Sequence, residues 1–291
     1  MQNRNKKLRD AGCIPFSMLF ICPGFVYDIQ REKERGFAMV TVIFPAAGQG
    51  RRMQAGMNKV FLELSGKPIL VRTLLKFSAS PSVDRLIVVV GADEVSMIER
   101  VLAKVPKLKP WKVTAGGSER QYSVQNGLGC IEPSSDIVLV HDAARPLVSQ
   151  ETIERVIAEA REHGAAIAAV REKNTVKVVG DDLLVKRTPS RAGLWEVQTP
   201  QGFQRDILVE AYQKAMQDDF LGTDDASLVE RLGIPVRVVE SDYRNIQVPT
   251  PEDLLVAGAL LRETDFLEVK DDVKDALKDA AAEIKERFFR R

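Results

Sequence analysis

From Met39 onward, short runs of apolar and β-branched residues alternate with longer stretches in which apolar residues recur at three- and four-residue steps. The short runs predict buried strands, and the longer stretches predict amphipathic helices. This alternation predicts an α/β fold, a mostly parallel sheet with helices on both faces. The predicted strands are Val40–Phe44, Leu86–Gly91, Trp111–Thr114, Ile137–Val140, Ala165–Val170 and Val236–Glu240. The predicted helices are Ile69–Phe77, Glu151–His163, Arg205–Gln217 and Asp224–Leu232.

Residues 172–200 break the alternation. Two short apolar runs, Thr175–Val179 and Leu183–Arg187, flank the turn residues Gly180, Asp181 and Asp182. Turn residues between two such runs predict a β-hairpin. A hairpin that projects from an α/β domain often pairs with another subunit. We therefore expect a Rossmann-like sheet that carries a dimerisation arm.

Both ends of the chain differ from this central domain, which we place at residues 39–262. Residues 1–38 are basic and polar at first. Their apolar stretch, Cys13–Val26, is interrupted by prolines and is too short and too broken to span a bilayer. We interpret them as a disordered leader or an over-extended start. Residues 263–291 show apolar side chains at helical spacing with a polar face of mixed charge, which predicts an amphipathic helix docked on the domain or on a dimer partner. No stable membrane insertion is expected.

Composition narrows the class of partner. The 291 residues contain 42 Lys and Arg against 41 Asp and Glu, so no overall basic field attracts nucleic acid. Three cysteines and two histidines, without metal spacing, argue against a disulfide framework and a zinc site. This cysteine usage indicates a reducing, cytoplasmic compartment. Because the charges of the chain nearly balance, any anion-binding site must be a local cluster of cations.

A loop of small residues and arginines follows the strand Val40–Phe44. Residues 45–53 read Pro-Ala-Ala-Gly-Gln-Gly-Arg-Arg-Met. Small residues let the backbone pass close to a ligand, and successive N–H groups in such a turn form an anion-binding nest. Two cations at this loop, Arg52 and Lys59, could stabilise charge on a phosphorus atom during transfer. The loop predicts a polyphosphate site.

Two more polar clusters follow predicted strands. Gly117 lies in a tight turn that opens a helix bearing Arg120 and Ser123 on one face, although a plain turn capped by Ser118 is an alternative. Asp142 follows the strand Ile137–Val140, where a carboxylate facing phosphates suits Mg²⁺. Its alternative is a structural ion pair with Arg145, and His141 is expected to be a hydrogen-bonded structural residue. Because the carboxyl ends of parallel strands share one sheet edge, we expect one common site.

These clusters occur in a fixed order with three further motifs, Thr199-Pro200-Gln201, Thr223-Asp224-Asp225-Ala226 and Asn245-Ile246. The ordered set resembles the 2-C-methyl-D-erythritol 4-phosphate cytidylyltransferase family over about Val40 to Arg262. Each motif alone is moderately specific, whereas the ordered set is highly specific. The resemblance covers neither terminus.

The resemblance implies a role for each matching residue. It implies that Arg52 and Lys59 are catalytic and steady the α-phosphorus of CTP, and that Asp142 holds Mg²⁺, for which other divalent cations could substitute. The implied nucleotide-binding residues are Ala46, Ala47, Gly48, Gly117, Arg120 and Ser123. The implied residues for the sugar phosphate are Arg145, Thr175, Arg191, Thr199 and Thr223. In this family the arm with Thr175 and Arg191 comes from the neighbouring subunit, which implies a homodimer.

The implied reaction is transfer of CMP from CTP to 2-C-methyl-D-erythritol 4-phosphate, in non-mevalonate isoprenoid precursor synthesis. The products are 4-diphosphocytidyl-2-C-methyl-D-erythritol and pyrophosphate. Two alternatives stay open: a D-ribitol 5-phosphate cytidylyltransferase, against which Ala144 argues, and a non-catalytic nucleotide-binding protein. The second alternative is suggested by the C-terminal helix and by Gln247, since this family usually has Lys at that position. A glycosyltransferase would need an Asp-x-Asp pair at the strand end, and none stands there.

Overall fold

The computed structural model describes residues 39–48, 59–250 and 252–262. For Lys59 it describes the backbone alone. The expected leader at residues 1–38, the expected C-terminal helix at 263–291 and the predicted catalytic Arg52 lie outside the described residues. These expectations stay predictions.

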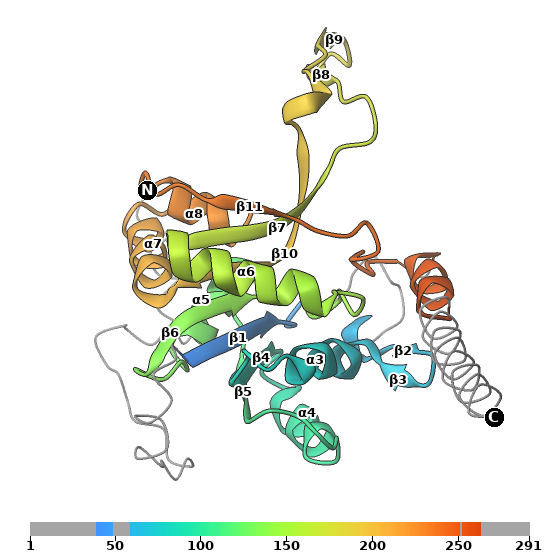
Figure 1. The fold of residues 1–291 in the computed structure, drawn as a ribbon, viewed down its shortest axis with the longest axis vertical. Coiled ribbons are helices and arrows are strands. Elements are labelled where there is room, and N and C mark those ends of the chain that lie inside the picture. The colour runs from blue at the N-terminus through green and yellow to red at the C-terminus, as the bar shows by residue number, and fades with distance from the viewer. Residues whose placement is uncertain (1–38, 49–58, 251, 263–291) are drawn as a thin grey trace, which may run out of the picture.

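A seven-stranded sheet forms the centre of the fold, in the order β11-β7-β10-β6-β1-β4-β5 (Figure 1). Its strands are β1 (Met39–Pro45), β4 (Arg85–Val90), β5 (Trp111–Ala115), β6 (Ser135–Val140), β7 (Ala165–Arg171), β10 (Trp195–Gln204) and β11 (Arg237–Glu240). Neighbouring strands pair in parallel except at β10, which is antiparallel to both β6 and β7. The predicted mostly parallel sheet is confirmed.

Strand β10 was not predicted from the sequence. Its middle is polar, with Gln198, Thr199 and Gln201 all buried, whereas a strand buried on both faces normally reads as a continuous apolar run. Pro200 cannot donate a ladder hydrogen bond, and the register of β10 against β7 shifts between Val197 and Gln201. The strand forms because both of its neighbours hydrogen-bond to it.

Helices cover both faces of the sheet, as predicted. One face carries α3 (Ile69–Ala79), α4 (Val95–Leu102) and α6 (Gln150–His163), and the other carries α5 (Arg120–Leu128), α7 (Arg205–Gln217) and α8 (Asp225–Glu230). Figure 1 shows α3 and α6 across the near face. The period-two alternation of strands explains the two cores, because Val42 and Phe44 of β1 pack into one and Ile43 into the other.

Helix α6 illustrates how local sequence sets the boundaries. Ser149 is its N-cap and accepts a hydrogen bond from the Thr152 N–H at 3.1 Å, a contact that typically stabilises a helix by about 1 kcal/mol. Gly164 ends the helix with a φ of +89°, a conformation that glycine adopts without strain. The helix therefore delivers the chain directly into β7.

The predicted hairpin is present as a projecting arm (Figure 1). It contains β8 (Val178–Val179), paired antiparallel with β9 (Val185–Arg187), and the 3₁₀ turn η3 (Arg191–Gly193). Both strands are shorter than predicted. Leu183 and Leu184 at its tip are 85% and 67% exposed, so the arm has no core of its own, and an isolated two-stranded hairpin is only marginally stable.

The remaining elements lie beside the sheet. They are η2 (Lys59–Phe61), β2 (Glu63–Leu64), β3 (Lys67–Pro68) and a helix over residues 252–262. A small third core joins them through Leu64, Ile69, Val248 and Leu261. Among the helices of the described ranges, none has the length and apolar character needed to cross a membrane.

Candidate functional site

The loops that follow β1 and β5 meet at one edge of the sheet. A Cβ atom added to Gly116 would lie 2.4 Å from the Ala47 Cβ and 2.8 Å from the Ser123 Oγ. Only glycine permits this approach. The backbone N–H of Ala46 donates to the Val89 carbonyl at 2.7 Å and fixes the first loop. The structure thus brings together the predicted nucleotide-binding residues of both loops.

Ser123 holds the turn after β5. Its hydroxyl accepts a hydrogen bond from the Gly117 N–H at 3.1 Å and donates one to the Glu119 carbonyl at 3.0 Å. Helix α5 begins at Arg120 with Glu119 as its N-cap, so the alternative in which Ser118 caps the helix is wrong. The N-terminal N–H groups of a helix and the positive end of its dipole favour anions. A phosphate-bearing ligand suits this end of α5.

Asp142 lies just after β6, at the same edge. Its Oδ2 is 3.1 Å from the Arg145 Nε, its Oδ1 is 3.5 Å from the Arg120 Nε, and the Gln247 amide donates to Oδ2 at 3.4 Å. Burial raises the pKa of this carboxyl, but Arg120 and Arg145 together outweigh burial and hold the pKa below its usual value. The carboxylate is therefore ionised at neutral pH, and its side chain remains 17% exposed. The ion pair with Arg145, which was the alternative to a metal ligand, is therefore present, and it lies beside an exposed edge that a metal ion could still use.

His141 supports the Asp142 loop from inside the protein. The Arg145 carbonyl accepts a hydrogen bond from Nε2 at 3.1 Å, which assigns the proton to Nε2 and leaves Nδ1 to accept from the Thr199 hydroxyl at 3.1 Å. The same Thr199 oxygen accepts from the Asp142 N–H at 3.0 Å. Burial lowers the pKa of His141 to about 3. The prediction of a hydrogen-bonded structural histidine is confirmed.

The predicted sugar-phosphate residue Thr223 also reaches this region. It is exposed and lines a small pocket with Arg120 and Asp225. Gln121 holds the loop in place by accepting a hydrogen bond from the Gly222 N–H at 2.9 Å. Thr199 differs from Thr223, because Thr199 is only 5% exposed. Its hydroxyl already forms hydrogen bonds with the Asp142 N–H and with His141 Nδ1.

The segment after β11, which contains Asn245 and Gln247, completes the site. Arg145 donates from Nη1 to the Asn245 carbonyl at 2.8 Å. The side chain of Asn245 is buried and donates to the Gln198 side chain and to the Thr199 carbonyl, at 3.0 and 2.8 Å. This contact connects the segment to β10. It explains why Gln247, two residues later, reaches Asp142.

Sequence reasoning missed several residues of this assembly. They are the buried side chains Gln121, Gln198, Gln201, Tyr212 and Asp225. Asp225 pairs with the predicted residue Arg120, and the other four hold Asp225 or the neighbouring loops through hydrogen bonds. Asp225 and Gln201 had a signal in the sequence, since they stand in the Thr-Asp-Asp-Ala and Thr-Pro-Gln motifs. The others lie on predicted helices or on the strand β10, where nothing in the local pattern distinguishes them.

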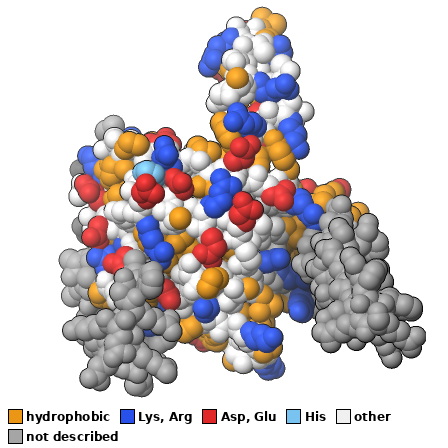
Figure 2. Space-filling model, in the orientation of Figure 1, with side chains coloured by type: hydrophobic (Ala, Val, Ile, Leu, Met, Phe, Trp, Pro, Cys, Tyr) orange, Lys and Arg blue, Asp and Glu red, His pale blue; other side chains and the backbone are white. Residues whose placement is uncertain are grey.

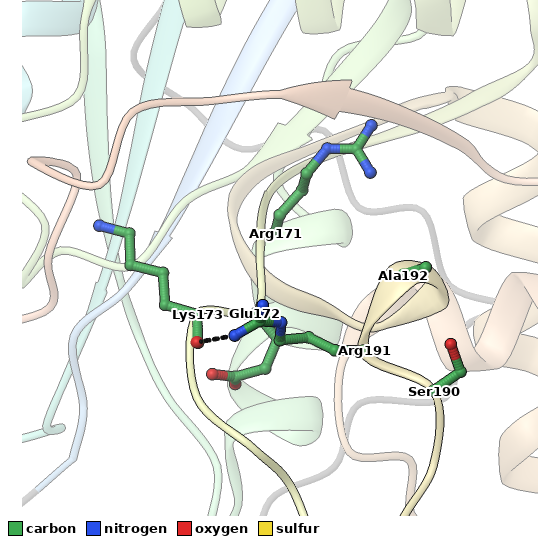
Figure 3. A pocket seen from close by; sticks show the side chains of 6 residues that line it. All are labelled: Arg171, Glu172, Lys173, Ser190, Arg191 and Ala192. Atoms are coloured by element: carbon green, nitrogen blue, oxygen red, sulfur yellow. Dashed lines mark hydrogen bonds between the residues drawn. The ribbon is translucent and has the colours of Figure 1, made fainter.

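Thr175 and Arg191 lie on the arm and not beside Asp142 of their own chain. Both are exposed, and the Arg191 Nη1 donates to the Lys173 carbonyl at 2.6 Å. Figure 2 shows Lys and Arg side chains gathered on this arm. At its base lies an open cavity of about 620 Å³ (Figure 3), which is lined by Arg171, Glu172, Lys173, Ser190, Arg191 and Ala192. The arm therefore offers cations to an anionic ligand from outside the sheet.

Two predicted residues border the undescribed segment 49–58. Gly48 is exposed at the end of the first loop, and Lys59 begins η2. The catalytic role of Lys59 stays a prediction.

The donor set at this edge suits Mg²⁺ better than zinc. Across residues 39–48, 59–250 and 252–262, no group of three His, Cys, Asp or Glu side chains could enclose a metal ion. Asp142 supplies one ionised and partly exposed carboxylate. Mg²⁺ typically binds through one or two carboxylates and completes its shell with substrate phosphates and water. Asp142 could hold Mg²⁺ only together with such a substrate.

Comparison with known proteins identifies the family. The model of the 2-C-methyl-D-erythritol 4-phosphate cytidylyltransferase family matches residues 40–263. The chain is 50% identical over 216 residues to the protein of that name from Geobacillus kaustophilus, covering 74% of this chain and 94% of the relative. It is 44% identical to the one from Caldanaerobacter subterraneus, covering 77% and 99%. The chain belongs to this family. It is a cytidylyltransferase, an enzyme that transfers a nucleotidyl group.

Solved structures agree with this assignment to the cytidylyltransferase family. The 4-diphosphocytidyl-2C-methyl-D-erythritol synthase from Anaerococcus prevotii superposes with a TM-score of 0.70 at 33% identity, covering 77% of this chain and 96% of that one. The 2-C-methyl-D-erythritol 4-phosphate cytidylyltransferase from Thermus thermophilus gives 0.63 at 32% identity, covering 77% and 99%. The Rossmann-like fold predicted from the sequence is therefore shared with these enzymes.

Proposed function

We propose that this protein transfers CMP from CTP to 2-C-methyl-D-erythritol 4-phosphate and releases pyrophosphate, in isoprenoid precursor synthesis. One observation carries the proposal. Ionised Asp142 shares a sheet edge with the glycine turn of α5 and lies between Arg120 and Arg145. This arrangement supports binding of a metal-bound triphosphate. The relatives described above are named for this reaction.

The reaction requires no dedicated general base. The nucleophile is an oxygen of the acceptor's phosphate monoester, whose second pKa is about 6, so it is largely ionised at pH 7. This oxygen forms a bond to the α-phosphorus of CTP while the bond from the α-phosphorus to the β-phosphate oxygen breaks, and pyrophosphate leaves with that electron pair. Two anions must be brought together, so cations and in-line positioning lower the barrier.

The residues of this chain divide that task. Ala46, Ala47, Gly48, Gly117 and Ser123 form a close-fitting backbone wall for the nucleotide. Asp142 would hold Mg²⁺ together with the triphosphate, and the bound ion would supply charge neutralisation at the phosphates. Arg52 and Lys59 are proposed to stabilise the charge on the α-phosphorus. Arg120 is proposed to join the nucleotide side, Arg145 and Thr223 to frame the acceptor side, and Thr199 to support that side through its hydrogen bonds to His141 and to the Asp142 N–H.

We further propose a homodimer in which each arm completes the partner's site. Thr175 and Arg191 are exposed on the arm, which also presents Leu183 and Leu184 to solvent. Apolar side chains exposed together indicate a protein contact. The expected cytoplasmic location stays a prediction from cysteine usage.

Pyrophosphate release from the purified protein tests the proposed function. With CTP and Mg²⁺, 2-C-methyl-D-erythritol 4-phosphate is expected to support turnover at least about tenfold better than D-ribitol 5-phosphate, because the acceptor pocket selects through several polar contacts. No described feature of this chain favours the ribitol alternative. Preference for ribitol phosphate would contradict the assigned acceptor. Release with neither acceptor, despite CTP binding, would support a non-catalytic protein.

Replacing Arg191 with alanine tests the arm. The KM for the sugar phosphate is expected to rise about 10- to 100-fold, with a smaller change in kcat, because a forked cation that binds phosphate is lost. Steady-state kinetics measure both constants. Arg187→Ala removes an exposed cation from β9 of the same arm and serves as the matched control. An unchanged KM in Arg191→Ala would remove this residue from the site.

Mixing two defective proteins tests whether the arm acts across subunits. Asp142→Asn and Arg191→Ala chains, allowed to exchange subunits fully, form mixed dimers in which one site has both native residues. Activity at low acceptor concentration should then recover to about a quarter of the wild-type value, because half of the dimers are mixed and each has one intact site. No recovery despite proven exchange would show that the arm serves its own chain.

A further inference from the structure

Arg120 lies between two carboxylates, and only one of them belongs to the site derived above. Its Nη1 is 2.9 Å from the Asp225 Oδ2, and its Nε is 3.5 Å from the Asp142 Oδ1. The guanidinium thus makes its closer ion pair with Asp225. Burial alone would lower the pKa of Arg120, but Asp225 and then Asp142 raise it above its usual value. The guanidinium therefore remains charged, and it lies closer to Asp225 than to Asp142.

Asp225 offers Arg120 a buried and hydrogen-bonded partner. The residue is fully buried near the start of α8, and the Tyr212 hydroxyl donates to its Oδ1 at 2.5 Å. A buried carboxylate remains ionised only when it is paired and hydrogen-bonded. Arg120 supplies the pairing and Tyr212 supplies the hydrogen bond. Asp225 therefore has no exposed edge for a ligand.

The loop that carries Asp225 is fixed from two sides. The Gln201 amide donates to the Asp224 Oδ2 at 2.7 Å, and its oxygen accepts from the Ala226 N–H at 3.1 Å. Gln121 holds the neighbouring Gly222 N–H at 2.9 Å. Asp225 consequently cannot follow Arg120 if the arginine shifts toward Asp142. The position of Arg120 is set from the Asp225 side.

We propose that Asp225 is a positioning residue that holds Arg120 back from Asp142 and so keeps the Asp142 carboxylate available to a divalent cation. This inference rests on the proposed function, in which Asp142 binds Mg²⁺ together with the triphosphate. The physical reason is competition. A guanidinium that pairs fully with Asp142 would oppose the metal by occupying the carboxylate and by adding a like charge beside it.

The test measures how much Mg²⁺ strengthens CTP binding. Calorimetry gives the Kd of CTP once with Mg²⁺ and once with EDTA, and the acceptor is left out so that no turnover occurs. We call the Kd with EDTA divided by the Kd with Mg²⁺ the metal gain. In Asp225→Asn the metal gain is expected to fall about three- to tenfold, because Arg120 loses its nearer carboxylate and turns to Asp142. Asp218→Asn removes the same charge from a carboxylate paired with Lys214 and Arg231. That control should leave the gain unchanged.

Two further variants separate positioning from general loosening. Tyr212→Phe weakens the buried network but keeps Asp225 charged next to Arg120, so the metal gain should stay at or above the wild-type value. The double variant Arg120→Gln/Asp225→Asn removes both partners of the pair. It should recover the metal gain lost in Asp225→Asn, even if CTP binds more weakly overall. If Asp225→Asn alone does not fold, a metal gain in Tyr212→Phe that falls below the wild-type value still overturns the inference.

Each result has a defined meaning. An equal fall of the metal gain in Asp225→Asn and Tyr212→Phe, or a wild-type gain in Asp225→Asn, would overturn the inference while leaving the proposed function intact. Failure of the double variant to recover the gain would also overturn it. A wild-type protein in which Mg²⁺ gives no gain, matched by an unchanged Asp142→Asn, would instead contradict the metal role of Asp142 in the proposed function.

Discussion

Replacement of Asp142 with asparagine is expected to lower kcat for cytidylyl transfer by about 10²- to 10⁴-fold, because the proposed metal ligand loses its charge at the reacting phosphates. The backbone of the loop should persist, since the Asp142 N–H still donates to Thr199 and His141 still binds the Arg145 carbonyl. The measurement is steady-state turnover with saturating CTP and Mg²⁺. Thermal unfolding checks that the fold is retained.

A matched control for Asp142→Asn comes from Asp206, a carboxylate near the start of α7 that is 85% exposed. Asp206→Asn makes the same chemical change far from any predicted site residue and should leave kcat unchanged. A kcat within about threefold of the wild type in a folded Asp142→Asn protein would show that the proposed metal-binding step does not limit turnover.

Acid stability should depend strongly on His141. Its folded pKa of about 3 lies below the ordinary value of 6.5, so between these values the unfolded chain binds a proton that the folded protein does not. Stability from this group is therefore complete above pH 6.5 and is lost as the pH falls toward 3, at up to about 1.4 kcal/mol per pH unit. Asp142 acts in a different window, because its lowered pKa makes its contribution fall only below about pH 4.

His141→Phe isolates this effect. Phenylalanine keeps the ring packing against Phe44 and Phe77, whose centroids lie 6.1 and 4.6 Å from the imidazole, but it leaves the Thr199 hydroxyl and the Arg145 carbonyl without their partner. The free energy of unfolding at pH 7 should drop by about 2–4 kcal/mol. Urea unfolding at one protein concentration should show the difference between variant and wild type narrowing by about 1–2 kcal/mol from pH 6.5 to pH 5.

A constant difference across that pH range would contradict the assignment of a buried neutral imidazole to His141. The exposed ion pairs of His163 with Glu159 and Glu162 are common to both proteins. They therefore do not contribute to the difference between the variant and the wild type. His163→Gln, made in the wild-type background, provides a control in which the slope between pH 6.5 and 5 should persist.

The apolar pattern predicted most of the fold because buried parallel strands are nearly continuous hydrophobic runs. Strands β1, β4, β6 and β7 all lie where such runs occur. Strand β10 was missed for the opposite reason. Its buried glutamines and threonine serve the hydrogen-bond network of the site, and that network is visible only once β6 and the Asn245 segment are in place.

The candidate site likewise contains residues that the sequence could predict and residues that it could not. Gly117, Ser123 and Asp142 could be predicted because each stands directly at the end of a predicted strand or the start of a predicted helix. Tyr212 could not, since it occupies an ordinary apolar position of α7 and gains its role from a carboxylate on the following helix. Functional residues that stand at the ends of predicted strands or helices can therefore be recognised in the sequence. Residues such as Tyr212, whose role depends on a contact with another element, cannot be recognised in this way.

The antiparallel direction of β10 has a consequence for how this enzyme could diversify. Since β7 ends and β10 begins at the same edge of the sheet, with Arg171 paired to Trp195, both attachment points of residues 172–194 lie side by side at that edge. A segment attached in this way can lengthen, shorten or be exchanged without breaking a strand of the core. Because we propose that this segment binds the acceptor, we expect that transplanting it between relatives alters which sugar phosphate is used and leaves the recognition of CTP unchanged.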